Sequence, residues 1–200
     1  LDVESKALTK LAANLDQKFS NLCEVILRSK GKIITLGVGK SGHIAQKISS
    51  TLSSTGSPSY FIHATEALHG DIGVISKNDS VLIFSHSGES KEIIDLIPSL
   101  KNIGCKIFSF TGPTESTIAK STDINISTEV DKEACPLDLA PTSSTTAALA
   151  LGDALAIALL ESRKFSPQDF AKSHPGGKLG KKLTLKVEDI MSKGKDFPFI

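Results

Sequence analysis

The feature that most restricts the fold of this chain is a series of short apolar runs, each followed by a polar or glycine-containing turn. Clear runs lie at residues 32–36, 59–62, 80–84 and 106–110, and a weaker one lies at 123–126. Segments of helical composition lie between and after them, at residues 44–52, 89–103 and 142–162. Strands that alternate with helices form a parallel sheet with helices on both faces. The series predicts an α/β fold, a three-layer αβα sandwich with a five-stranded parallel sheet.

A chain of 200 residues is long enough to form one domain with its own hydrophobic core, and we expect a single domain of this kind. An amphipathic helix is expected over residues 2–29, where apolar residues recur at helical spacing, and Gly31 is expected to end it. The apolar stretch at 147–160 is interrupted by Gly152 and Asp153 and is shorter than a membrane span. We therefore expect it to be a buried helix.

Charge and composition disfavour several classes of partner. The 23 Lys and Arg residues against 22 Asp and Glu leave a net charge of +1, too little to attract polyanions or an anionic membrane. Aromatic residues make up 5% of the chain, with no Trp, so few side chains are available for stacking on bases. No nucleic-acid or membrane partner is expected. Three cysteines without a C-x-x-C pair favour a reducing compartment, which predicts a cytoplasmic protein.

Two loops of the same kind, at residues 36–42 and 85–90, follow the first and third apolar runs. Each combines glycine, which lets the backbone approach a ligand, with small hydroxyl side chains and a helix start whose N–H groups lack partners. In a parallel sheet such loops lie at the carboxyl ends of the strands, where ligands bind. They predict a site for a small phosphate group, with contacts from Gly39, Ser41, Ser85, Ser87, Gly88 and Ser90.

The first loop also matches the dinucleotide-binding pattern G-x-G-x-x-G at residues 37–42. That pattern calls for an acid near the end of the second strand, but this strand ends at His63, and Glu66 lies beyond it. The dinucleotide interpretation is thereby weakened. A Walker A loop is excluded because Ile34 stands where its first glycine is needed. Two further alternatives stay open: a tight turn without a ligand, and serines that only cap helices.

Several motifs together resemble those of sugar isomerase (SIS) domains, and within them the arabinose 5-phosphate isomerases of lipopolysaccharide precursor synthesis. The resemblance covers nearly the whole chain. The motifs are Gly37-Val38-Gly39-Lys40-Ser41-Gly42-His43, His69-Gly70-Asp71, Ser87-Gly88-Glu89-Ser90 with Glu92, Glu133-Ala134-Cys135-Pro136-Leu137 leading into 139–146, and Ser173-His174-Pro175-Gly176-Gly177. One position departs from the pattern, because relatives more often carry Asn where this chain has His86.

The resemblance implies reversible conversion of D-ribulose 5-phosphate to D-arabinose 5-phosphate, a step that feeds the synthesis of Kdo. An aldose–ketose isomerisation moves a proton between neighbouring carbons through an enediol. It needs a base, an acid and a group that stabilises the developing oxyanion. The implied catalytic residues are Lys40, Glu92, Glu133 and His174, and no cofactor is implied. We expect Lys40 to be the electrostatic partner and either Glu133 or His174 to move the proton.

Substrate contacts are expected outside the two loops as well, at Gly56, His63, His69, Thr142 and Ser143. His63 is also a candidate ligand for an inhibitory metal ion, although two histidines alone do not make a metal site. The family places the loop around His174 near the active site of an adjacent subunit. This implies an oligomer, which we expect to be a homotetramer that binds a small sugar phosphate.

Residues 1–184 are expected to form the SIS domain, and residues 185–200 to begin a missing pair of CBS domains. The tail Val187-Glu188-Asp189-Ile190-Met191 looks like the entry to such a pair. Two other functions stay open. One is a non-catalytic sensor of sugar phosphates, since SIS modules also occur in regulators, but a sensor has no use for Glu133 together with His174. The other is isomerisation of a different sugar phosphate.

Overall fold

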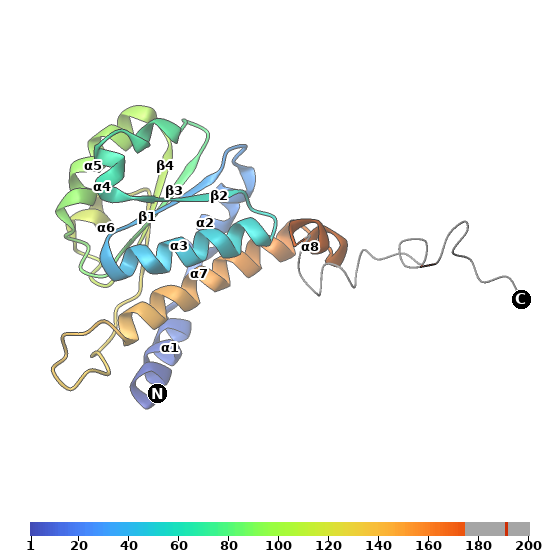
Figure 1. The fold of residues 1–200 in the computed structure, drawn as a ribbon. Coiled ribbons are helices and arrows are strands. Elements are labelled where there is room, and N and C mark those ends of the chain that lie inside the picture. Colours follow the sequence, from blue (N-terminus) through green and yellow to red (C-terminus); the bar gives the residue numbers. More distant parts are fainter. Residues whose placement is uncertain (175–190, 192–200) are drawn as a thin grey trace, which may run out of the picture.

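A five-stranded parallel sheet forms the centre of the computed structural model, which describes residues 1–174 and Met191 (Figure 1). The strand order is β2-β1-β3-β4-β5, and every neighbouring pair is parallel. The strands are β1 (Ile33–Gly37), β2 (Ser59–His63), β3 (Ser80–Ser85), β4 (Lys106–Thr111) and β5 (Ile124–Ser127). The predicted α/β sandwich is confirmed, including its weakest strand.

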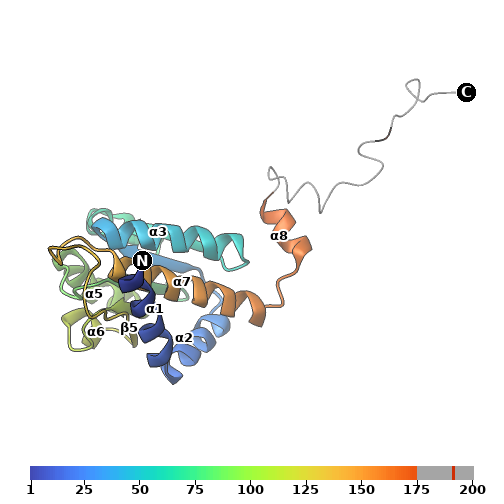
Figure 2. The ribbon, with the colours of Figure 1, turned by 90° about the horizontal axis from the view of Figure 1, so that it is seen from below.

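Helices cover both faces of this sheet. One face carries α1 (Asp2–Asn14), α2 (Gln17–Arg28), α3 (Gly39–Ser54) and α7 (Ser143–Ser162), which lie side by side in Figure 2. The other face carries α4 (Ala64–Leu68), the 3-10 helix η1 (Asp71–Val74), α5 (Lys91–Ile103) and α6 (Thr117–Ser121). Within the described residues, α8 (Pro167–Ser173) follows α7. Alternate strand residues enter the two hydrophobic cores, so β1 and β3 are buried along their whole length.

The expectation of one continuous helix over residues 2–29 was wrong, because the chain forms two helices, α1 and α2, with a break between them. Leu15 has an extended backbone, and the side chain of Asp16 accepts a hydrogen bond from the Lys18 N–H at 2.8 Å. Asp16 is therefore the N-cap of a new helix. The apolar spacing continues across the break because both helices pack on the same core, to which Leu11 and Leu22 belong.

The strand order makes β1 and β3 the place where the winding direction of the sheet reverses. The chain leaves β1 for α3 on one face and leaves β3 for α5 on the other face. Gly37 at the end of β1 lies in register with Phe84 near the end of β3. In open α/β sheets ligands bind at such a switch point, at the carboxyl ends of the strands. Both predicted phosphate loops follow these two strands.

Helix α7 is long and apolar enough, by length and composition, to cross a membrane. In this fold it packs against α1, α2 and α3, and eight of its residues are buried. It approaches α3 most closely at Gly152, where an added Cβ atom would lie 2.5 Å from Cγ1 of Ile48. Next to this contact Lys47 and Asp153 form an ion pair of 2.5 Å between the two helices. The expectation of a core helix over this segment is confirmed.

Helix α7 runs along the sheet in the direction opposite to the strands. Its first turn lies near Ser85, at the end of β3, since Ser144, Thr145 and Ser85 line one cavity. Its C-cap residue Arg163 lines a different recess together with Ser80, at the start of β3. A helix of 20 residues is about 30 Å long. Helix α8 therefore follows at the edge of the sheet where the strands begin (Figure 1).

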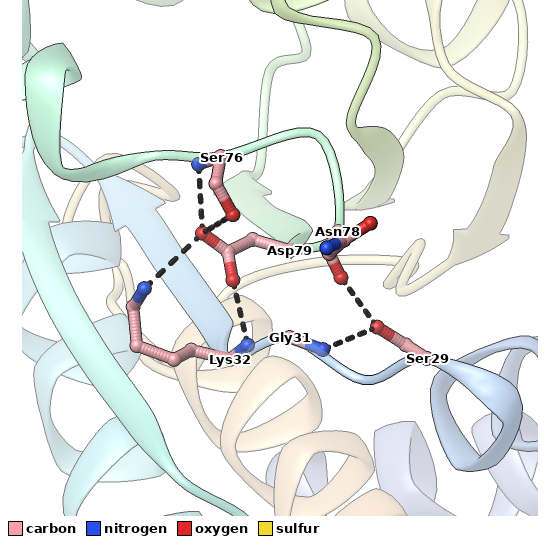
Figure 3. A network of polar contacts seen from close by, with 6 residues as sticks. All are labelled: Ser29, Gly31, Lys32, Ser76, Asn78 and Asp79. Carbon is pink, nitrogen blue, oxygen red and sulfur yellow. Dashed lines mark hydrogen bonds and ion pairs between the residues drawn. The ribbon is translucent and has the colours of Figure 1, made fainter.

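The strand-start edge is held together by a network around Asp79 (Figure 3). The Asp79 carboxylate accepts hydrogen bonds from the Lys32 N–H (2.7 Å), the Ser76 N–H (2.8 Å) and the Ser76 hydroxyl (3.0 Å). The Lys32 ammonium adds an ion pair at 3.3 Å. Burial by itself raises the pKa of Asp79, but the bonds from Lys32 and Ser76 outweigh it and lower the pKa below its ordinary value. The network joins the starts of β1 and β3.

The predicted domain boundary at 184 and the segment 185–200, except Met191, lie outside the described residues.

Candidate active site

The two helices that begin at the switch point have free backbone N–H groups in their first turns. The N-cap residues of α3 and α5, Val38 and Ser90, make no side-chain capping bond. By contrast, the side chains of Asp16, His63, Ser116 and Ser166 cap α2, α4, α6 and α8. Uncapped helix starts offer N–H donors and a positive dipole end to an anion. The N-cap residues of α1 and α7, Leu1 and Thr142, also make no such bond, but α3 and α5 follow β1 and β3 directly at the switch point. Their position together with their free starts marks the two loops as an anion site.

In the second loop, the serines contact each other and leave the helix start open. The Ser85 and Ser90 hydroxyls are 3.0 Å apart, so Ser90 does not cap α5. The Ser87 hydroxyl accepts a bond from the Glu89 N–H at 3.2 Å. Glu89 itself turns away, and its carboxylate accepts the Thr117 N–H at 2.8 Å. The capping alternative fails for Ser90.

In the first loop, the three glycines have two different roles. An added Cβ on Gly37 would lie 3.0 Å from Cα of Gly42, so these two glycines let α3 pack closely on β1. Gly39 has a φ of +54° and faces open space. The ring of His63, where a dinucleotide site would need an acid, accepts the Thr65 N–H at 3.3 Å. The pattern match is therefore explained by helix–strand packing.

A small cavity opens beside these loops, between the first turns of α3 and α7. Ser41 and Ile44 line it from α3, and Ser144, Thr145 and Ala148 line it from α7. Thr128 and Pro141 form a further part of the wall. The rest of the wall comes from residues at and after the ends of β3 and β4, namely Phe84, Ser85, His86 and Phe110. Lys40 and Glu92 are exposed in the first turns of α3 and α5. Polar donors, a cation and a carboxylate thus meet at one edge of the sheet.

Glu133 lies in the connection between β5 and α7, and its carboxylate contacts the start of α7. It accepts hydrogen bonds from the backbone and the hydroxyl of both Thr142 and Ser144. Burial raises the pKa of Glu133, but these bonds outweigh the burial and lower its pKa. The Thr142 donors are therefore already used, and the Ser143 side chain has no exposed surface. The Ser143 hydroxyl has no hydrogen-bond partner among the described residues, but it is buried, so neither residue presents an accessible free hydroxyl to a substrate in this conformation.

The two histidines predicted near the second strand lie at the same edge of the sheet. His63 ends β2 in register with Gly37 of β1, and His69 is the exposed C-cap of α4. No three His, Cys, Asp or Glu side chains of residues 1–174 come close enough together to hold a metal ion. The metal proposed for His63 therefore has no ready-made set of ligands in this part of the chain.

Gly56 and His174 are not brought together with the other predicted site residues. Gly56 follows α3 at the strand-start edge, where an added Cβ would lie 2.4 Å from the Phe165 ring. His174 is the C-cap of α8, its Nδ1 is 2.9 Å from the Phe170 carbonyl oxygen, and its ring stacks on Phe170 with centroids 3.9 Å apart. Within one chain, the length of α7 separates these two residues from the loops.

Sequence reasoning missed the cavity wall formed by Phe110 and Thr128. Thr128 follows β5 directly, and its N–H donates to the Thr111 carbonyl oxygen at 2.7 Å. The rule that polar residues at strand ends face a ligand could have identified it. The contact of Glu133 with α7 left no local signal in the sequence.

Replacing Gly88 with Ala should destabilise the fold and weaken binding of inorganic phosphate. Gly88 has a φ of +67°, and an added Cβ would lie 2.0 Å from Oγ of Ser116, the N-cap of α6. Backbone strain and overpacking together should cost about 2–4 kcal/mol of unfolding free energy. Urea unfolding and calorimetric phosphate titration measure the two effects.

Gly104→Ala is the matched control for this prediction. Gly104 has a φ of +80°, but an added Cβ there meets nothing within 4 Å. This variant should lose only about 1–2 kcal/mol, the cost of the backbone conformation. Equal losses in the two variants would contradict the proposed clash with Ser116.

Comparisons with known proteins identify the family of this chain. A family model described as the SIS domain matches residues 26–158. The arabinose 5-phosphate isomerase KdsD of Pseudomonas aeruginosa is 52% identical over 198 residues, which cover 99% of this chain and 61% of that protein. KdsD of Escherichia coli K12 is 50% identical over 200 residues, which cover 100% of this chain and 61% of that protein. The chain thus spans about three-fifths of the length of these curated relatives.

A solved structure shares the fold closely. The protein c3406 of E. coli CFT073, in complex with arabinose 5-phosphate, is 44% identical and has a TM-score of 0.85. The match covers 87% of this chain and 93% of that one. Because the family model matches well over half of the sequence and the sheet and its loops agree with the motifs, this chain belongs to the SIS domain family.

Proposed function

We propose that this chain is the isomerase module of an arabinose 5-phosphate isomerase, which interconverts D-arabinose 5-phosphate and D-ribulose 5-phosphate. The observation that carries the proposal is the pair of uncapped helix starts at the β1/β3 switch point, with Lys40 beside them. Relatives about 50% identical over almost the whole chain have the same name, and c3406 was solved with arabinose 5-phosphate. In this proposal the two loops hold the phosphate end of the sugar.

The proposed chemistry is an enediol mechanism without a cofactor. A base removes the proton from C2 of the aldose while an acid protonates the carbonyl oxygen at C1. The reverse pair of transfers then delivers a proton to C1 and leaves the carbonyl at C2. The ammonium of Lys40 stabilises the developing oxyanion, and Glu92, Glu133 and His174 are the candidates for proton transfer. The ketose and the aldose differ only in where that proton and the carbonyl lie.

The direct test is incubation of the protein with arabinose 5-phosphate while ribulose 5-phosphate is measured. Ribose 5-phosphate and glucose 6-phosphate run in parallel identify a different sugar specificity. Binding of arabinose 5-phosphate without turnover of any of the three would favour a sugar-phosphate sensor instead. If the protein neither binds nor converts any of these sugar phosphates, both proposals are rejected.

The second part of the proposal is that His174 serves the active site of another copy in a homotetramer. It is supported by the length of α7, which puts His174 and its own chain's loops at opposite edges of the sheet. A site that needs both Lys40 and His174 is then incomplete in a single chain. Gly56 lies at the same edge as His174 and belongs to the same proposed contact.

Mixing two inactive variants tests this sharing. Lys40→Ala and His174→Ala should each have low activity alone, and chains reassociated from both should regain up to about a quarter of the wild-type activity, because random pairing restores that share of the sites. Refolding each variant alone is the control. If the mixture stays as inactive as its components, His174 does not act across a subunit interface.

The remaining proposals concern the whole protein. We propose residues 1–184 as the SIS domain, residues 185–200 as the entry to a CBS-domain pair, and a cytoplasmic location in which the product supplies Kdo and lipopolysaccharide synthesis. The tail sequence 187–191 and the greater length of the KdsD relatives support the CBS proposal. The intact mass of the native protein tests it, since a mass near that of 200 residues would reject it.

A further inference from the structure

Both oxygens of the Glu133 carboxylate accept hydrogen bonds from the start of α7. Oε2 accepts from the Thr142 N–H (2.7 Å), the Thr142 hydroxyl (3.0 Å) and the Ser144 N–H (3.2 Å), and Oε1 accepts from the Ser144 hydroxyl. An ionised carboxylate offers about four acceptor positions. Three of these donors converge on Oε2 and leave it no free acceptor position, whereas Oε1 keeps one.

These bonds give α7 the cap that its own N-cap residue lacks. Thr142 makes no capping bond to the helix, and Glu133 supplies the acceptor and the negative charge from nine residues earlier. A negative charge at a helix start is stabilising. The capped turn includes Ser144, which with Thr145 lines the cavity. Glu133 thereby fixes one wall of the cavity.

The carboxylate is itself held in place by its own loop. The Glu133 N–H donates to the Asp138 carboxylate at 2.6 Å, and the Ala134 N–H donates to the Thr142 hydroxyl at 2.7 Å. The Thr142 hydroxyl thus joins the backbone of the loop to the carboxylate. Burial raises the pKa of Glu133, but the bonds from Ser144 and Thr142 outweigh it and lower the pKa, which makes Glu133 a weaker base.

We infer that Glu133 is a positioning residue, which pins the first turn of α7 and so shapes the cavity, and that it does not move the proton. The inference rests on the proposed isomerase function and deepens it. It leaves Glu92, together with His174 of a neighbouring copy, as the candidates for proton transfer. Glu133 acts on the substrate through Ser144 and Thr145.

Comparison of Glu133→Gln with Glu133→Ala separates positioning from proton transfer. A glutamine keeps the shape, and its amide oxygen accepts the three bonds that Oε2 accepts now. Its NH₂ group faces the Ser144 hydroxyl, which can rotate to become the acceptor. A positioning role predicts that Gln keeps kcat within about tenfold of wild type, whereas Ala raises KM and lowers kcat by about 10²-fold or more. A base cannot be replaced by Gln, so proton transfer by Glu133 predicts equally low kcat in both variants.

Amide hydrogen exchange at Thr142 and Ser144 reports the pinned turn independently of activity. Exchange should be roughly tenfold faster or more in Glu133→Ala and close to wild type in Glu133→Gln. Glu129→Ala, which removes an exposed carboxylate from the same connection, is the control and should change neither exchange nor kinetics.

Two results would overturn the inference. One is a Glu133→Gln enzyme as inactive as Glu133→Ala while its Thr142 and Ser144 amides stay protected. The other is exchange in Glu133→Ala that equals wild type, because the carboxylate then holds nothing. If wild-type protein turns over no sugar phosphate, the proposed function fails, and the exchange measurement alone still decides whether Glu133 pins α7.

Discussion

Lys40→Ala is expected to lower kcat for the isomerisation of arabinose 5-phosphate by about 10²–10³-fold, the loss typical when one group that stabilises an oxyanion is removed. Lys40 is exposed in the first turn of α3, beside the uncapped helix start, and forms no ion pair with any other residue of 1–174. Its charge is therefore available to a substrate. The folded state should be unaffected, because an exposed side chain without a partner contributes little to stability.

Lys47→Ala on the same helix is the matched control for this loss. Lys47 lies seven residues further along α3, where it pairs with Asp153 on the surface. Exposed pairs of this kind contribute about 0–1 kcal/mol, so kcat should not change and unfolding should change only slightly. Steady-state kinetics and thermal unfolding of both variants give the comparison. A Lys40→Ala enzyme with wild-type kcat would remove Lys40 from the mechanism.

Asp79→Ala is expected to lower the free energy of unfolding by about 3–5 kcal/mol, the largest stability effect that we predict. Asp79 is 2% exposed, and its loss leaves the N–H groups of Lys32 and Ser76 without acceptors at the strand-start edge. Buried donors without partners are costly, and here they lie where β1 and β3 begin. Urea unfolding monitored by circular dichroism measures the change.

Lys32→Ala separates the hydrogen bonds of Asp79 from its ion pair. The Lys32 side chain is 36% exposed, so its loss should cost about 1 kcal/mol or less. If the unfolding free energy of Asp79→Ala lies within about 1 kcal/mol of that of Lys32→Ala, the backbone bonds of the network are not important for stability.

The same network predicts how stability depends on pH. Because the pKa of Asp79 is lowered in the folded state, its stabilising contribution is fully present above the unfolded carboxyl pKa of about 3.9. It is lost as the pH falls through the lower, folded-state pKa. Asp79→Asn should therefore weaken the dependence of unfolding free energy on pH in acid. An unchanged dependence would assign the acid sensitivity to other carboxylates.

The strands and the two loops could be predicted from the sequence because their signals are local. An apolar run such as residues 80–84 is buried on both faces and is followed at once by its serine loop. The helix break at Asp16 was also marked locally, by a residue that caps helices. It was missed because the apolar periodicity continues through it into a second helix that packs on the same core.

The parts of the site that could not be predicted depend on where distant segments come together. The bonds of Glu133 to Thr142 and Ser144 span a loop whose path is set by tertiary packing. The separation of His174 from the loops depends on the direction in which α7 crosses the sheet. Neither the loop path nor the direction of α7 has a periodicity or a spacing that a sequence displays.

The close approach of α3 and α7 at Gly152 has a consequence for selectivity. The cavity lies between the first turns of these helices, and Ile48 and Gly152 lie seven residues, or about two turns, beyond Ser41 and Thr145, respectively. The absence of a side chain at Gly152 sets how far apart the two helix axes stand. The width of the cavity is thus governed by an apolar contact that lies two turns away from it. A side chain at this one position would therefore change the width of the cavity, while the residues of the two loops stay the same.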